Sequence, residues 1–302
     1  MKGMFGKAGK AARLGAVLAL AALVWLGMAG PAAAADKDAG GSSMDRVQAA
    51  EKNRQKWQGG APAPLADTDP ELASMRDRLV YGEILNEGTL TDRQAALVTL
   101  AALTASQGLE ALSAQAEAAL RVGASAADIR EALYQCAAYV GFPRVEAALR
   151  VVNPVLTKHG ATLPLPPEAT VDEATRLADG LAVQRQIFGA KGIDAMRENA
   201  PAGQKAIVAN YLSAYCFGDL YTRKVLDLKM RELITFSAIV ALGGCDPQAK
   251  AHAGANVSVG NTKQNLVDAL AVMLPLIGFP RTLNGLAAVN AALPEDAGQV
   301  RR

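Results

Sequence analysis

Three side chains near the carboxyl end of the sequence could do chemistry together: Glu232, Cys245 and His252. An imidazole moves protons near neutral pH, and a carboxylate can orient it or accept its proton. A thiol becomes a nucleophile once it loses its proton. The three residues therefore predict either acid–base chemistry or thiol chemistry. The chain has only two histidines and three cysteines. A zinc site built from these ligands is hard to assemble, and we expect no metal and no other cofactor.

The residues around Cys245 predict a break between two helices. Gly243 and Gly244 end one helix, and Asp246 followed by Pro247 is typical of the start of the next. Cys245 then lies just outside a helix amino terminus, where the positive end of the helix dipole favours a thiolate and the neighbouring Asp246 opposes it.

Helical spacing also links two of the candidate residues. Gln248 and His252 are four residues apart, so they share one face of the second helix. Glu232 lies one helix earlier. Spacing alone leaves open whether these side chains touch.

Each candidate also has a purely structural interpretation. His252 lies among alanines and fits a helix interface, Cys245 fits a small inert residue, and Arg231 with Glu232 fits a solvated helix face. An odd number of cysteines cannot pair within one chain, so at least one is free or bonded to another molecule. Cys136 and Cys216 lie in apolar stretches and are expected in the core.

The elements that must position these residues are predicted to be helices. Long Ala- and Leu-rich stretches have helical periodicity and are interrupted by Gly and Pro, whereas β-branched runs of period two are missing. We therefore predict an all-α fold. The clearest helical stretches are Thr91–Ser106, Ala126–Val140, Lys229–Leu242 and Thr262–Leu276.

The sequence contains an internal repeat. The run from Gly141 to Arg144 recurs from Gly278 to Arg281, an offset of 137 positions, and other identities share that offset downstream of Arg93. Upstream of Arg93 the register slips by one. The two copies cover roughly residues 69–156 and 204–293. Arg144 and Arg281 follow the same Pro in each copy, so we expect them to serve a shared turn.

The repeat and the composition divide the chain into six parts. We predict a signal peptide (1–35), a flexible leader (36–69), a first repeat (70–158), a linker containing three prolines (159–170), a second repeat (171–295) and a tail (296–302). The second repeat carries Glu232, Cys245 and His252, where the first has Ala95, Gly108 and Gln115. We therefore interpret the first repeat as having a degenerate site.

The amino terminus predicts export. A basic region precedes an apolar stretch of roughly 16 residues and four consecutive alanines, which is typical of a secretory signal and short for a membrane-spanning helix. We expect cleavage near Ala35, no membrane anchor afterwards and a periplasmic location. The formal charge of +2 includes four basic residues of this segment, so the rest of the chain is close to neutral and has no charge pattern for nucleic acid.

The polar residues and the repeated turn together resemble a known family. Arg231 and Glu232 at a helix start, Cys245, Gln248 and His252 in the next helix, and the repeated Gly-Phe-Pro turn are similar to the carboxymuconolactone decarboxylase family, which includes alkylhydroperoxidase D-like proteins. The resemblance implies an all-helical fold, trimers or rings of six, and sites in clefts between helices. A tandem chain would then form a homotrimer that mimics a hexamer.

The resemblance implies two possible chemistries. Alkylhydroperoxidase D-like members use a Glu, a pair of cysteines and a His, but here Gln248 replaces the second Cys, which would leave a peroxidase with Cys245 alone. Decarboxylase-like members act on a small lactone bearing carboxylates; His252 would then move the proton and Arg231 would hold a carboxylate. We favour decarboxylation or lactone isomerisation of a small carboxylate. Peroxidase chemistry and a non-catalytic binding or scaffolding protein are the alternatives.

Overall fold

The structure is a computed structural model that describes residues 43–294. These residues form helices joined by loops, with no strand among them, which confirms the all-α prediction. The predicted signal peptide, its cleavage site and the tail lie outside the described residues. The homotrimer stays a prediction.

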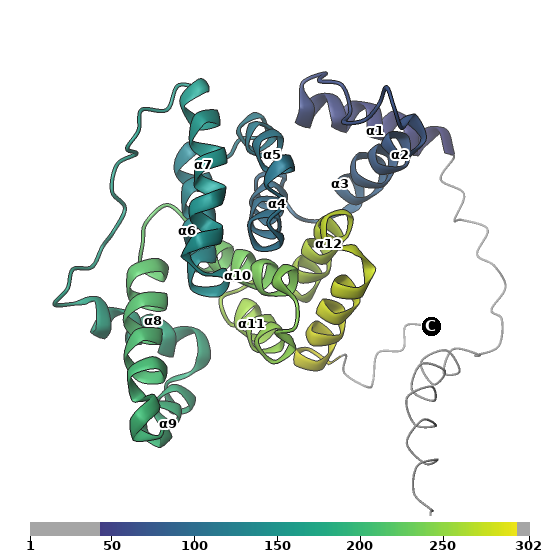
Figure 1. Ribbon diagram of the computed structural model, residues 1–302. Helices are drawn as coiled ribbons and strands as arrows, with labels where there is room; N and C mark the ends of the chain where they lie inside the picture. Colours follow the sequence, from purple (N-terminus) through teal and green to yellow (C-terminus); the bar gives the residue numbers. More distant parts are fainter. Residues whose placement is uncertain (1–42, 295–302) are drawn as a thin grey trace, which may run out of the picture. The chain divides into compact units, whose positions relative to one another are not determined.

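The helices fall into two series of similar order, although α9 of the second series has no helical counterpart in the first (Figure 1). The first copy consists of α1 (Ser43–Gln58), α2 (Pro70–Asp77), the π-helix η1 (Arg78–Ile84), α3 (Leu85–Glu87), α4 (Asp92–Ser106), α5 (Leu109–Arg121), α6 (Ala126–Val140) and α7 (Phe142–Lys158). The second consists of α8 (Arg176–Phe188), α9 (Ala190–Asn199), the 3-10 turn η2 (Ala202–Gln204), the π-helix η3 (Ala206–Tyr221), α10 (Leu228–Leu242), α11 (Asp246–Ser258) and α12 (Lys263–Ala292).

Side-chain caps begin the main helices at matching places in the two copies. Ser125 and Thr262 open α6 and α12 with reciprocal capping boxes, in which each hydroxyl accepts from a backbone N–H three residues later. Thr91 caps α4 in the same way, and Asp227 caps α10. Unpaired N–H groups of the first helical turn are thereby satisfied.

The caps also correct the register of the repeat. The caps of α6 and α12 are 137 residues apart, but Thr91 and Asp227 are 136 apart. The one-residue slip therefore lies in the turn after α4, not upstream of Arg93. Glu232 corresponds to Ala96 rather than Ala95, and Ala95 corresponds to Arg231. The first copy still lacks the acid and the imidazole.

The first copy begins earlier than the sequence predicted. Residues 43–58, expected in a flexible leader, form α1, and Ala50 and Trp57 are buried in the core. Arg46 of α1 forms an ion pair with Glu83, at 2.6 Å, and Arg176 of α8 pairs with Asp219 at the matching place. Helix α1 is thus the counterpart of α8. The sequence of α1 is mostly polar, so it lacks the apolar periodicity from which the other helices were predicted.

The repeated turn is structural, as expected. Gly141 and Gly278 have φ angles of 84° and 75°, which favour glycine. Arg144 then donates to the carbonyl oxygen of Ala105, and Arg281 donates to that of Ala241 at 2.7 Å. Each arginine ties the start of one helix to the end of α4 or α10.

The two copies share one apolar core. Helices α4 and α10 pack against each other, and each also contacts α6 and α12. Leu97 and Leu100 of α4 and Leu233 and Phe236 of α10 are fully buried in the same cluster. Because the central apolar faces cover one another, each copy depends on the other for burial.

One described helix, α12, is long and apolar enough to cross a membrane by length and composition, with a mean hydropathy of 1.5 over its most apolar window. Gly278 divides it into two segments. Leu266, Met273 and Val289 of these segments are fully buried against other helices. The burial of these side chains indicates a core role for α12.

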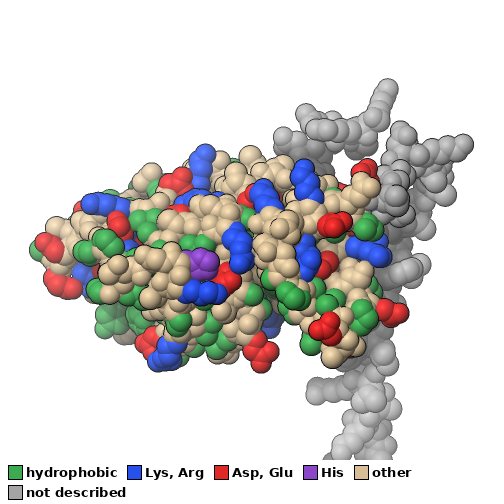
Figure 2. Space-filling view, turned by 90° about the horizontal axis from the view of Figure 1, so that it is seen from above, with side chains coloured by type: hydrophobic (Ala, Val, Ile, Leu, Met, Phe, Trp, Pro, Cys, Tyr) green, Lys and Arg blue, Asp and Glu red, His purple; other side chains and the backbone are tan. Residues whose placement is uncertain are grey.

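On the face of the molecule that Figure 2 shows, Lys and Arg side chains are interspersed with Asp and Glu side chains.

Candidate active site

Helices α10 and α11 bring Glu232 and His252 into direct contact. The imidazole Nδ1 lies 2.8 Å from Oε2 of Glu232. Glu232 is fully buried, and His252 is 8% exposed. With Glu232 as a carboxylate, Nδ1–H donates to it and Nε2 is left to face a reacting molecule. No described residue hydrogen-bonds to Nε2. The pair that the sequence could only suggest is therefore present.

Tyr221, the last residue of η3, completes the surroundings of the carboxylate. Its hydroxyl donates to Oε1 of Glu232 at 2.7 Å and lies 2.9 Å from Oγ1 of Thr235. Burial, and then the neighbouring Glu232 carboxyl, raise the pKa of Tyr221 well above 10.0. Tyr221 therefore stays protonated and acts as a fixed donor that orients the carboxylate.

The first copy supplies part of the wall of this site. Tyr139 of α6 lies with its hydroxyl 3.0 Å from that of Tyr221, and its ring meets the His252 ring edge-on, with centroids 5.5 Å apart. Phe188, at the end of α8, meets His252 edge-on from its own copy at 5.3 Å. Two aromatic rings thus restrict the orientation of the imidazole.

Cys245 lies apart from this pair. It is the N-cap residue of α11 and half-buried, and among the described residues its Sγ hydrogen-bonds only to the Gly243 carbonyl oxygen, at 3.5 Å. It lines a separate cavity of about 190 Å³ with Arg281 and Asn284, which neither Glu232 nor His252 lines. The predicted grouping of acid, sulfur and imidazole in one cleft is therefore wrong for the sulfur. Seven residues of helix place Cys245 and His252 about 10 Å apart along the axis.

The two predicted substrate-binding residues are placed differently from expectation. Gln248 is exposed, and its side chain has no hydrogen bond to the described residues. Arg231 is fully buried and bonds to Gln135, Glu131 and the backbone oxygens of Arg223, Lys224 and Leu226. Its guanidinium group is thus occupied by the protein. Arg231 does not hold a substrate carboxylate in this arrangement.

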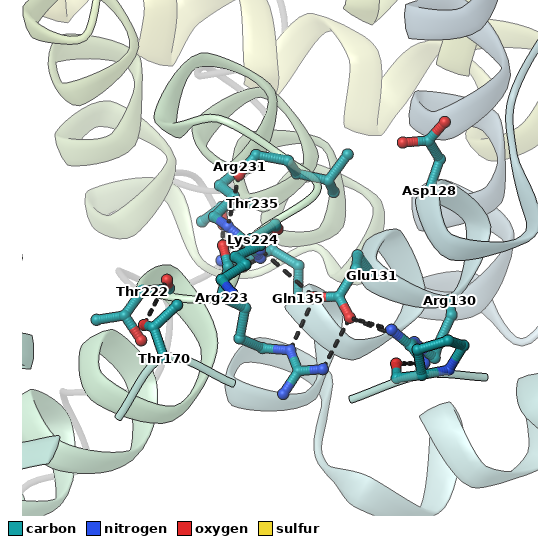
Figure 3. A network of polar contacts seen from close by, with 12 residues as sticks. Asp128, Arg130, Glu131, Gln135, Thr170, Thr222, Arg223, Lys224, Arg231 and Thr235 are labelled. Atoms are coloured by element: carbon teal, nitrogen blue, oxygen red, sulfur yellow. Dashed lines mark hydrogen bonds and ion pairs between the residues drawn. The ribbon is translucent and has the colours of Figure 1, made fainter. Parts of the chain in front are cut away.

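Arg231 belongs to an ionic cluster, which we define as Arg130, Glu131, Gln135, Arg223 and Arg231 and in which all but the half-buried Arg223 are buried (Figure 3). The two oxygens of Glu131 accept from Nε and Nη2 of Arg223, both at 2.8 Å. Gln135 donates to Thr235, which links the cluster to Tyr221 and Glu232. One network of hydrogen bonds therefore extends from the first copy to the imidazole.

The other two cysteines are buried, as predicted. Burial raises the pKa of Cys136 and of Cys216 to about 12. Cys216 also lies 3.4 Å from the Tyr139 hydroxyl. The three cysteines are unpaired with one another. No group of three or more His, Cys, Asp or Glu within residues 43–294 could hold a metal ion.

Sequence reasoning missed the residues that surround the pair. Tyr221, Tyr139 and Phe188 come from three helices, and nothing in their spacing connects them with His252. One usable signal was available, because the repeat aligns Tyr221 with Leu85. This is a difference of the same kind as the change from Ala96 to Glu232.

The fold and the site define a class of protein: a tandem helical chain with one buried carboxylate–imidazole pair. The carboxymuconolactone decarboxylase family matches residues 70–154 and 208–291, which lie in the two copies. A 4-carboxymuconolactone decarboxylase of Acinetobacter baylyi is 28% identical over 123 residues, which cover 41% of this chain and 85% of that protein. The chain belongs to the carboxymuconolactone decarboxylase family, as two tandem copies, and the resemblance noted from the sequence is confirmed.

Proposed function

We propose that the protein is an enzyme that decarboxylates or isomerises a small organic carboxylate by acid–base catalysis at His252. The observation that carries the proposal is the 2.8 Å contact between His252 and the buried Glu232. Family membership and the decarboxylase relative support the same reaction class.

The geometry supports one task for each residue. His252 presents Nε2 to the substrate, and Glu232 fixes the other nitrogen and stabilises the imidazolium form. Tyr221 positions Glu232 without changing its own protonation. In decarboxylation, the bond to the carboxylate breaks and CO₂ leaves its electron pair on the neighbouring carbon, where Nε2–H of the imidazolium supplies the proton. Solvent then restores that proton. In isomerisation, neutral Nε2 removes a proton from one carbon and returns it to another.

Thiol peroxidase chemistry is favoured less because of the position of Cys245. A peroxidatic thiol of this type needs the imidazole as a proton relay, and Cys245 shares neither a contact nor a cavity with His252. Cys136 and Cys216 cannot replace the missing second cysteine, because burial raises their thiol pKa to about 12.

The first test compares two single substitutions. Small lactones and carboxylates are screened by thermal shift, and each ligand that stabilises the protein is assayed for CO₂ release and for isomerisation. Cys245→Ser should retain at least about half of the activity, whereas His252→Ala should reduce it by about 10²-fold or more. Equal loss in both variants, or peroxide reduction that depends on Cys245, would contradict the proposal. Activity in neither assay, together with no effect of His252→Ala on ligand stabilisation, would favour the scaffolding alternative.

We also propose that the protein acts after export to the periplasm. The support is the basic and apolar pattern before Ala35. Expression of the full chain in a Gram-negative host should give periplasmic protein. Its intact mass should correspond to a chain that begins near Asp36. A full-length cytoplasmic product would contradict this part of the proposal.

A further inference from the structure

A cavity of about 350 Å³ opens between η1, α3, α4 and α12, and no residue of the ionic cluster lines it. Its lining combines apolar side chains, such as Ile84, Leu90 and Val272, with carboxylates, including Glu87 and Asp268. No Lys or Arg lines it. An apolar pocket with acidic groups favours a ligand that has a cationic head and an alkyl tail.

The repeat makes this cavity the counterpart of the ionic cluster. With offsets of 136 in α4 and 137 in α12, Ala95 stands where the second copy has Arg231, and Asp268 stands where the first has Glu131. Glu87 corresponds to Arg223. In the cluster, two guanidinium groups contact the Glu131 carboxylate. At the cavity, Asp268 keeps the carboxylate, but Ala95 and Glu87 stand in place of the two arginines.

The carboxylate at the cavity has only neutral partners. Asp268 is 7% exposed. Its Oδ2 accepts from the backbone N–H of Thr89 at 2.6 Å and from the Thr89 hydroxyl, and its Oδ1 accepts from Gln264 at 2.8 Å. Glu131, in contrast, accepts from arginines only. A carboxylate oxygen has room for two donors, so Oδ1 can accept another.

The remaining acids at the cavity differ in their pairing. Glu83 pairs with Arg46, and Asp92 pairs with Lys56. Glu87 is exposed, and its carboxylate has no hydrogen bond or ion pair with a described residue. Glu87 and Asp268 therefore give the cavity negative charge that no described cation neutralises.

We propose that this cavity binds a small alkylguanidinium cation. The planar head donates to Asp268, as Arg231 and Arg223 do to Glu131 in the ionic cluster, and Glu87 adds charge attraction at the cavity wall. The alkyl tail lies along Ile84, Leu90 and Val272. The site is separate from the Glu232–His252 pair.

The test is calorimetric titration of the full chain with butylguanidinium, compared with neutral butylurea of similar shape. Butylguanidinium should bind one molecule per chain, at least about tenfold more tightly than butylurea, because charge-assisted hydrogen bonds are the stronger ones. Absence of saturable binding, or equal affinity for the two compounds, would overturn the proposal.

Three variants locate the binding. Ala95→Arg brings the guanidinium group of the twin copy into the cavity, so it should abolish binding of the free cation. Glu87→Gln changes an exposed side chain that pairs with no described residue, and it should weaken binding several-fold. Glu146→Gln, an equal charge change at an exposed position on α7, should have no effect. Unchanged binding by both Ala95→Arg and Glu87→Gln would refute this location.

A fourth variant separates this inference from the proposed function. His252→Ala should bind butylguanidinium as the unmodified chain does, although it loses the acid–base group. Loss of binding in His252→Ala would place the cation at the candidate active site and contradict the inference.

Discussion

Changing Glu232 to Gln is expected to reduce kcat/KM by about 10²- to 10⁴-fold while the helices stay intact. The amide presents an NH₂ group or a neutral oxygen to Nδ1 of His252, where the structure has a carboxylate oxygen at 2.8 Å. The imidazolium form then loses its compensating charge. The NH₂ orientation would also move the ring proton to Nε2, the atom that we propose meets the substrate.

Tyr221→Phe is the matched control for this change. It removes the hydroxyl that donates to Oε1 of Glu232 at 2.7 Å but leaves the carboxylate and its contact with His252. Its kcat/KM should fall far less, by about tenfold. Both variants are measured over a range of pH, with circular dichroism as the check on folding. If Glu232→Gln keeps the activity of the unmodified chain, or if Tyr221→Phe loses as much, the carboxylate does not assist the imidazole.

Local patterns predicted most of the fold, because each helix carries its own periodicity and its own cap. The repeat was visible because two turns share the Gly-Phe-Pro-Arg sequence, and their backbone demands a positive φ and an arginine anchor. Helix α1 was missed because its contribution to the core rests on a few side chains, above all Trp57. Its remaining residues are mostly polar, a composition that is typical of a flexible leader.

The candidate site could be predicted only as far as helix faces allow. Glu232 and His252 meet because α10 and α11 pack against each other, which adjacent helices commonly do. Cys245 adjoins the helix of His252, but its cap position places it in a cavity that His252 does not line. Arg231 is buried because it pairs with Glu131, which lies 100 residues earlier, and no local sequence pattern predicts such a pairing.

Changing Glu131 to Gln is expected to lower the free energy of unfolding by about 3–5 kcal/mol, because it leaves buried guanidinium groups without their carboxylate. Glu131 is fully buried and pairs with Arg130, Arg223 and Arg231. Arg130 and Arg231 are themselves largely or fully buried, so neither can turn to solvent. Urea unfolding at neutral pH, followed by circular dichroism, measures the loss.

Asp268→Asn provides the control, because Asp268 occupies the matching place in the repeat but accepts from neutral donors only. Its substitution removes no ion pair with a described residue and should cost about 1–2 kcal/mol. An equal loss in the two variants would mean that the arginines add nothing to the role of Glu131.

The same ion pairs predict how the stability difference depends on pH. Burial raises the pKa of Glu131, but hydrogen bonding to Arg223 and the charges of Arg223, Arg231 and Arg130 together outweigh burial, so the pKa lies below 4.5 in the folded chain. A depressed folded pKa means that the contribution of Glu131 is fully present above the unfolded value of about 4.5, and is lost as the pH falls towards the folded value. The difference in unfolding free energy between the unmodified chain and Glu131→Gln should therefore stay constant from about pH 7 to about pH 5 and shrink at lower pH. A difference that grows on acidification would show that Glu131 is protonated in the folded chain and that the three arginines are balanced by another group.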